Sequence, residues 1–80
     1  MKLLNKKTGK QLTIEKVSCG VKVTQASPFG GVHTLYIDTT QEKIIEYHTT
    51  GRMIQEVFPG LSADEREFIM TGIPPEQWPS

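Results

Sequence analysis

The sequence predicts an α+β fold, with a small antiparallel sheet of four to five strands covered by two short C-terminal helices and a terminal turn. Two observations point to this class. Apolar and polar residues alternate along several short stretches before residue 48, which is the period of a strand with one buried face. After Gly51 the apolar residues recur at helical spacing instead. Helices this short are marginal alone in water, so they are expected to pack on the sheet.

The strands follow from this alternation and from the turns between them. Residues 11–17 and 21–24 alternate on either side of a short break, and they predict a hairpin or a bulged pair of strands. A loop at 25–31, which contains Pro and adjacent Gly residues, leads to a strand at 32–38. Residues 43–48 are expected to pair with that strand as a second hairpin across a polar turn.

The clearest local signal is the start of a helix at Ser62. Ser62 and Glu65 have the spacing of a capping box, and Gly72 is suited to end the same helix. Pro75 then begins a last turn. A shorter helix is expected before Ser62, with four apolar residues in one stripe: Met53, Ile54, Val57 and Phe58.

The 80 residues are expected to form a single domain, 1–80, with a β-rich half at 1–48 and a helical half at 51–80. The formal net charge is zero, but the charges are divided. Residues 1–37 hold six lysines and one glutamate, and residues 38–80 hold three basic and eight acidic residues. Such a division is typical of an anion-binding end, or of two halves that attract each other. We favour the second interpretation, within one fold or between the subunits of a homo-oligomer.

The single cysteine, Cys19, cannot form an internal disulfide and is expected to be a small buried side chain. The basic opening at residues 2–7 is not followed by the apolar segment of a signal peptide. No apolar run approaches the roughly 20 residues that a membrane span needs. We therefore expect a cytoplasmic protein without a membrane contact.

The segment from Ile54 to Ile73, completed by Pro75 and Trp78, resembles the C-terminal module of a group of small uncharacterised phage and plasmid proteins. The shared pattern is roughly IQxxFPxLSxxEREFxxTGIxPxxW, at residues 54–78. The resemblance implies a mobile-element origin and, for a phage-encoded chain, the host cytoplasm as its location. It implies no agreed activity and no catalytic residues. Small phage proteins of this build commonly act by binding, so the resemblance favours a host-manipulating or anti-defence role.

Patterns for catalysis and metal binding are weak. His33 and His48 would approach each other if the second hairpin forms, with Asp38 nearby, but no spacing fixes a further ligand and structural zinc uses four. Cys19 lies in no motif that would pair a nucleophile with a base. We expect no metal, no cofactor and no enzymatic activity.

The loop before the third strand is the strongest candidate for ligand contact. Its adjacent glycines, Gly30 and Gly31, favour positive φ and can expose amides to an anion, and Phe29 can stack on a base. Together with Lys22 and His33 they form the predicted ligand-binding set. No nucleotide-binding glycine motif is present, so a simple hairpin connection explains the same residues.

Three functions stay open at this point. The first is a phage-type protein that binds and inhibits a host protein through an acidic or aromatic surface of the helical half, with contacts from Glu56, Glu67 and Trp78. The second is an oligomeric sponge that sequesters a small anionic, nucleotide-like ligand at the predicted ligand-binding set. The third is weak, salt-sensitive nucleic-acid binding through the lysines of the first half.

Overall fold

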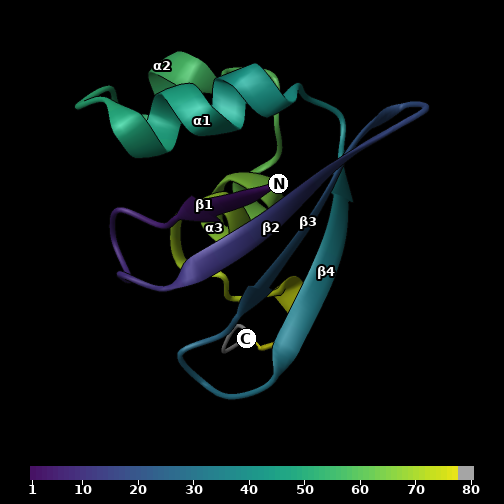
Figure 1. Ribbon diagram of the computed structural model, residues 1–80, viewed down its shortest axis with the longest axis vertical. Coiled ribbons are helices and arrows are strands. Elements are labelled where there is room, and N and C mark those ends of the chain that lie inside the picture. Colours follow the sequence, from purple (N-terminus) through teal and green to yellow (C-terminus); the bar gives the residue numbers. More distant parts are fainter. Residues whose placement is uncertain (78–80) are drawn as a thin grey trace.

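Four strands form one antiparallel sheet in which each strand pairs with the next along the chain (Figure 1). In the computed structural model, which describes residues 1–77, the strands are β1 (Lys2–Leu4), β2 (Gln11–Val17), β3 (Gly20–Ala26) and β4 (Val32–Ile37). β1 and β4 are the edge strands. The predicted α+β class and small antiparallel sheet are confirmed.

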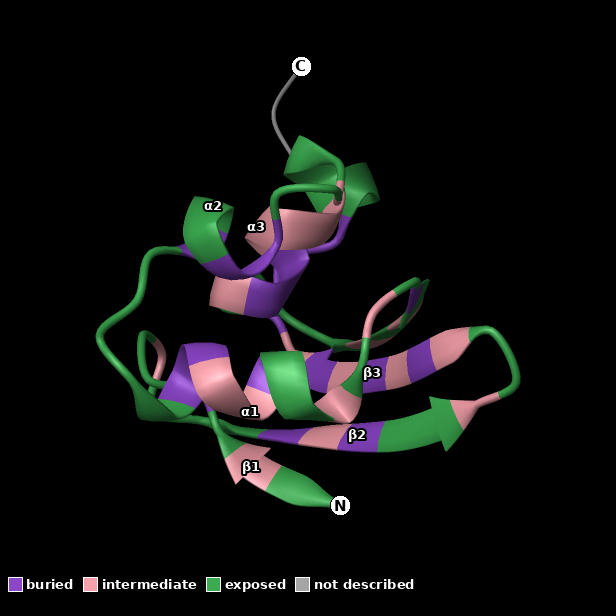
Figure 2. Cartoon of the chain, turned by 90° about the horizontal axis from the view of Figure 1, so that it is seen from above, coloured by how far each residue is buried: buried purple, intermediate pink, exposed green. Residues whose placement is uncertain are grey.

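Helices follow the sheet and cover one of its faces. They are α1 (Gln41–Thr49), α2 (Ile54–Val57), α3 (Ala63–Thr71) and the 3-10 turn η1 (Pro75–Gln77). Buried and more exposed residues alternate along the central strands, as Figure 2 shows for β3. The sheet therefore has an inner face against the helices and an outer face on which residues such as Glu15 and Tyr36 are exposed.

One predicted strand is a helix. Residues 43–48, which we expected to pair with 32–38, lie within α1. The buried residues of this helix are Ile44, Tyr47 and His48, whose spacing of three and four places them on one helical face. The Thr40 hydroxyl caps the helix by accepting a hydrogen bond from the Lys43 amide. A short run with two adjacent isoleucines favoured a strand, but the cap and the packing of this face decide the structure.

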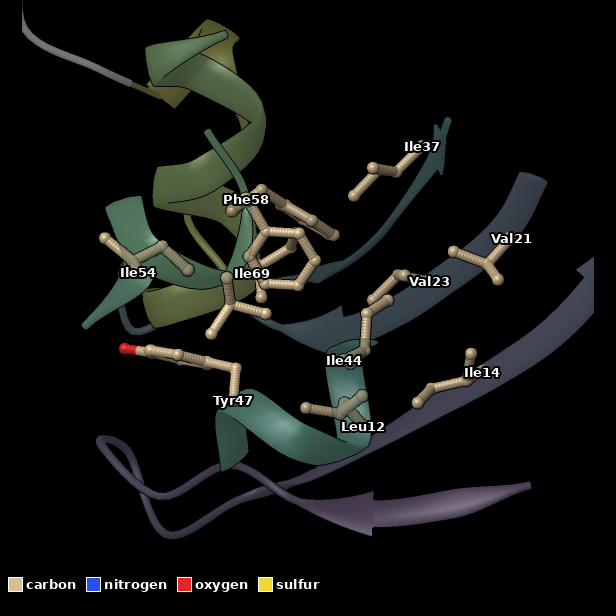
Figure 3. Close-up of a cluster of buried hydrophobic side chains, with 12 residues drawn as sticks. Leu12, Ile14, Val21, Val23, Ile37, Ile44, Tyr47, Ile54, Phe58 and Ile69 are labelled. Atoms are coloured by element: carbon tan, nitrogen blue, oxygen red, sulfur yellow. The ribbon is translucent and has the colours of Figure 1, made fainter. Parts of the chain in front are cut away.

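The boundary between the β-rich part and the helical part of the chain therefore differs from the predicted one. The β-rich part ends at Ile37, and the helical part begins at Gln41 rather than at residue 51. Both parts contribute to one core (Figure 3), in which the inner side chains of β2, β3 and β4 face those of the helices. Burial of an aliphatic or aromatic side chain contributes about 1.5–3 kcal/mol, so packing rather than intrinsic propensity holds these short helices. The buried side chains that the helical part adds to the core include Ile44, Tyr47, Phe58, Phe68 and Ile69.

Two expectations about single residues are wrong. Cys19 is exposed, because it lies in the turn between β2 and β3 at the tip of a hairpin that extends beyond the helices (Figure 1). Met53 is 63% exposed, because α2 is a single turn that begins after it, at Ile54. The other three members of the predicted stripe are buried, as expected.

Ion pairs do not hold the two parts of the chain together in the way that the charge division suggested. Among residues 1–77, Lys22 pairs with Glu15 and Arg52 with Glu46, each within its own half of the sequence. Between the halves, the described residues form one contact of this kind, in which His33 Nδ1 lies 3.8 Å from Glu76 Oε1. The apolar core and hydrogen bonds to α3 therefore join the halves.

Both ends of α3 form as predicted. The Ser62 hydroxyl accepts from the Glu65 amide, and the Glu65 carboxylate accepts from the Ser62 amide, which is a complete capping box. Gly72 ends the helix in the left-handed region, with φ of +80°. A Cβ atom at Gly72 would lie 2.7 Å from the carbonyl oxygen of Ala26, at the end of β3. Glycine is thus required both for its φ and for the close approach of α3 to the sheet.

We expect Gly72→Ala to lower the free energy of unfolding by about 2 kcal/mol or more, because it combines an unfavourable φ with a clash against backbone. Gly51→Ala is the matched control, since Gly51 has no positive φ and no atom within 4 Å of an added Cβ. That variant should stay within about 0.5 kcal/mol of the wild type. Urea unfolding of the three proteins measures both effects. Equal losses in the two variants would show that the approach of α3 to β3 is not tight.

Candidate functional site

The loop between β3 and β4 and the last turn of the chain lie together. Gly30 and Gly31 have φ of +108° and +80°, as the sequence predicted for this loop. The Gln77 side chain accepts a hydrogen bond from the Ser27 hydroxyl and donates one to the Gly30 carbonyl. His33 Nε2 lies 3.2 Å from the same Gly30 oxygen. No pattern in the sequence indicates that these two segments, nearly 50 residues apart, meet.

Two backbone amides of this loop are engaged in hydrogen bonds within the loop itself. The Phe29 amide donates to the Ser27 hydroxyl at 3.1 Å, and the Gly30 amide donates to the Ser27 carbonyl at 3.0 Å. An anion-binding nest needs such N–H groups to point at the ligand, so these two are already occupied. Phe29 is 65% exposed and is the large apolar residue of this exposed loop that is open to a partner.

The structure does not bring the predicted ligand-binding set into one place. Lys22 and Gln25 alternate along β3, and Gln25 is buried on the inner face, so Lys22 lies on the outer face. His33 pairs with Gln25 in the register and therefore lies on the inner-face side. Lys22 Nζ is also 3.6 Å from the Glu15 carboxylate. Lys22 and His33 thus lie on opposite faces of the sheet.

The lysines of the first half are also dispersed. Lys6, Lys7 and Lys10 lie in the connection between β1 and β2, whereas Lys22 lies on the outer face of the sheet. Lys6 is engaged, because its Nζ donates to the carbonyls of Thr50 and Arg52, at the end of α1. The described residues do not form a continuous basic stripe of the kind that follows a phosphate backbone.

A cluster of buried polar side chains holds the last turn of α3, and we call it the α3 clamp: Asn5, Gln25 and His48. Asn5 Nδ2 donates to Gln25 Oε1 and to the carbonyl of Ile69. Gln25 Nε2 donates to the carbonyl of Phe68 at 2.6 Å. His48 Nε2 lies 3.1 Å from the Ile69 oxygen. Three segments that precede α3 thus meet at its C-terminal end.

His48 is held in its neutral form. Its Nδ1 accepts a hydrogen bond from the Lys6 amide at 3.3 Å, so Nε2 carries the proton that is donated to Ile69. Burial lowers the pKa of His48 to about 4; the hydrogen bond to Ile69 acts in the opposite direction, and the charge of Lys6 lowers the pKa further. With both ring nitrogens engaged, His48 serves the structure of the core.

The expected approach of His33 and His48 depended on the second hairpin, which does not form. His48 is on α1 and His33 on β4, each with its own partners. No group of three or more His, Cys, Asp or Glu side chains that could hold a metal ion occurs within residues 1–77.

The residues predicted to contact a partner protein have different surroundings. The carboxylate of Glu56 accepts from the Met53 amide, so it caps α2 from the exposed side. Glu67 is half-buried on α3, and its charge acts on Tyr47, whose pKa is raised first by burial and then by this carboxylate. Trp78 lies outside the described residues.

Met53 lies at a groove that the sequence did not predict. The groove has a volume of about 350 Å³ and lies where the connections after β1 and α1 meet α2 and α3. Its apolar lining comes from Tyr47, Met53, Ile54 and Met70. We call it the Met53 groove. Its members are distant in sequence, so no local pattern in the sequence indicates it.

The rim of the Met53 groove is basic. Lys6, Lys7 and Arg52 contribute to its lining. Lys6 Nζ lies 4.0 Å from the centre of the Tyr47 ring, which is a cation–π contact. Arg52 is paired with Glu46 at 2.6 Å. The groove thus combines an exposed methionine and a buried aromatic ring with three positive charges.

Within residues 1–77, no helix is long and apolar enough to cross a membrane. Comparison with known proteins found no matching family model, no matching curated protein and no matching solved structure.

The neutral state of His48 predicts a pH dependence of stability. Unfolded histidine has a pKa near 6.5, and folded His48 one of about 4, so between these values the unfolded chain binds the extra proton. Stability should be fully present above about pH 6.5 and should fall as the pH drops toward 4, by up to about 3 kcal/mol from this residue.

Urea unfolding at several pH values between 7 and 4 measures this loss. His48→Gln retains a donor and an acceptor but does not titrate, so its stability should fall less steeply over the same range. All other titratable groups are common to the two proteins, so the comparison isolates residue 48. Parallel curves for the two proteins would contradict the assignment of a buried neutral His48.

Proposed function

We propose that this chain is a non-enzymatic binding protein of a mobile element, which binds and inhibits a host protein through the Met53 groove. The observation that carries the proposal is the exposure of Met53, 63%, beside an apolar hollow. Large apolar side chains that are exposed at a groove with a charged rim are typical of protein-binding surfaces, and methionine is enriched there because it adapts to different partners.

The chemistry of the groove indicates the kind of partner segment. Tyr47, Ile54 and Met70 offer apolar contact, and the basic rim favours carboxylates on the partner. An apolar side chain flanked by Asp or Glu residues fits both features. Glu56 accepts a hydrogen bond from the Met53 amide, but neither Glu56 nor Glu67 lines the groove, so their contact with a partner stays a separate prediction from the sequence.

A role without catalysis is supported by the engagement of the histidines. His48 uses both ring nitrogens in the α3 clamp, and His33 Nε2 contacts the Gly30 carbonyl. Cys19 is exposed on a hairpin tip. A nucleophile needs a base within hydrogen-bond reach, and Cys19 has no hydrogen bond to either histidine among the described residues. The mobile-element part of the proposal rests on the resemblance of residues 54–78.

Substitution of Met53 by Asp tests the groove. The variant places a negative charge at the apolar centre of the proposed contact, so we expect its affinity for the captured host protein to fall at least about tenfold. Capture from bacterial lysate identifies the host protein, and titration of that purified protein gives the affinity. Its own activity, measured with and without the chain, reports inhibition.

Leu4→Asp is the matched control. Leu4 is 59% exposed on β1 and does not line the groove, so the same change of charge there should leave the affinity unaltered. Both positions are exposed, which keeps the core of each variant intact. If Met53→Asp binds the host protein as tightly as Leu4→Asp does, the groove is not the binding surface.

A further inference from the structure

The outer edge of β4 is a row of unpaired backbone groups. β4 pairs with β3 on one side and is the last strand of the sheet (Figure 1). The Ser27 amide donates to the Gly31 carbonyl, one step beyond the pairing of Ala26 with Val32. In an antiparallel ladder, opposed pairs that exchange backbone hydrogen bonds alternate with pairs that exchange none. Since Gly31 is bonded to Ser27, the residues of β4 that bond to β3 are His33, Leu35 and Ile37. Residues 32, 34 and 36 therefore turn their N–H and C=O groups outward.

These outward groups have no partner in the described chain. Outside the strand ladders, no backbone–backbone hydrogen bond within residues 1–77 involves Val32, Thr34 or Tyr36. Their side chains are on the outer face, and Val32 and Tyr36 are 70% and 69% exposed. One strand thus presents free hydrogen-bonding groups together with exposed β-branched and aromatic side chains.

β4 lacks the features that usually protect an edge. Edge strands are commonly short, or carry lysine, proline or a bulge. The opposite edge, β1, has such protection, since it is three residues long and carries Lys2. β4 has six residues, VHTLYI, with no lysine, arginine, aspartate, glutamate or proline, and its register with β3 is continuous. An edge of this kind is suited to accept a further strand.

We propose that the strand added to this edge is β4 of a second copy of the chain. Antiparallel pairing about a twofold axis at Thr34 places each Thr34 opposite the other, and Val32 opposite the partner's Tyr36. In this register, all outward groups of residues 32, 34 and 36 meet their counterparts, because each pair exchanges two backbone hydrogen bonds. The edge is therefore complementary to itself.

The side chains and the lack of charge of β4 favour pairing with β4 of a second copy over pairing with a strand of a different protein. Val32 against Tyr36 is an aromatic and β-branched pair, a favourable combination across antiparallel strands. Thr24 and Thr34 already form a hydroxyl contact of 2.9 Å on the outer face, and a second Thr34 continues that row across the interface. A charged edge would repel its own copy, whereas β4 carries no Asp, Glu, Lys or Arg. The resulting sheet has eight strands, with the helices of both copies on its inner face.

The proposed dimer leaves the Met53 groove open, because the groove lies beside the connection that follows β1, at the other edge of the sheet. The two proposals are therefore independent, and either can fail alone. Sedimentation equilibrium in reducing buffer, which excludes disulfides through the exposed Cys19, should give twice the monomer mass at about 100 μM. Hydrogen exchange should show protection of the Val32, Thr34 and Tyr36 amides that increases with protein concentration.

Two double variants, which differ in the sign of one charge, test the register. Val32→Glu with Tyr36→Glu places like charges opposite each other twice, so this double variant should be monomeric. Val32→Lys with Tyr36→Glu removes the same apolar groups but places opposite charges together, and it should dimerise at least tenfold more tightly than the first. Positions 32 and 36 lie on the exposed outer face, so both variants are expected to fold, and circular dichroism checks that they do. Leu4→Glu, on the other edge, should dimerise as the wild type does.

Three results would overturn the proposal. A monomer mass at every concentration excludes the second copy. Equal association of the two double variants excludes pairing about Thr34. Protection of the β4 amides only after addition of a captured host protein assigns the edge to a strand of that protein instead.

Discussion

The carbonyl groups at the end of α3 impose the strictest constraint on this chain. Phe68 and Ile69 have buried side chains, and their carbonyls point into the molecule where water cannot replace a missing donor. An unpaired buried carbonyl costs about 1–3 kcal/mol. In the α3 clamp, Asn5 and His48 donate to the Ile69 carbonyl, and Gln25 donates to the Phe68 carbonyl beside the Gly72 amide. No buried side-chain N or O atom in the described residues lacks a partner. The positions of β3, α1 and the connection after β1 are thereby linked to one another.

This constraint explains why polar residues interrupt an otherwise apolar interior. Gln25 follows Val21 and Val23 on the inner face of β3, where another aliphatic residue would pack but could not donate. Asn5 has a second task, since its Oδ1 accepts from the amides of Lys7 and Thr8 and shapes the turn before β2. Gly72 completes the arrangement by allowing the chain to pass against Ala26. The helical layer is thus fixed by directional contacts as well as by burial.

Local signals were sufficient for much of the fold. The alternation at 11–17 and 21–24, the capping box at Ser62 and the glycine at 72 each depend on neighbours in sequence, and the structure contains all of them. Residues 43–48 were assigned to a strand because a short apolar run is compatible with either period, and packing against the sheet decided the outcome. The Met53 groove, the α3 clamp and the contact of Gln77 with the Gly30 loop join segments far apart, and no local pattern encodes such contacts. The free edge of β4 could not be predicted, because it depends on the strand order, which the composition does not contain.

The α3 clamp also has a consequence for the order of folding. Neighbouring strands are consecutive in the chain, so the sheet is built from local pairings that can form quickly. The amide of Asn5, however, bonds to a carbonyl 64 residues later. During synthesis the sheet and α1 can therefore assemble while Asn5 and Gln25 still lack their partners in α3, and the arrival of α3 completes the α3 clamp. Because α3 is synthesised after the strands and α1, the chain passes through a stage with part of its core exposed, which chaperones or proteases can meet.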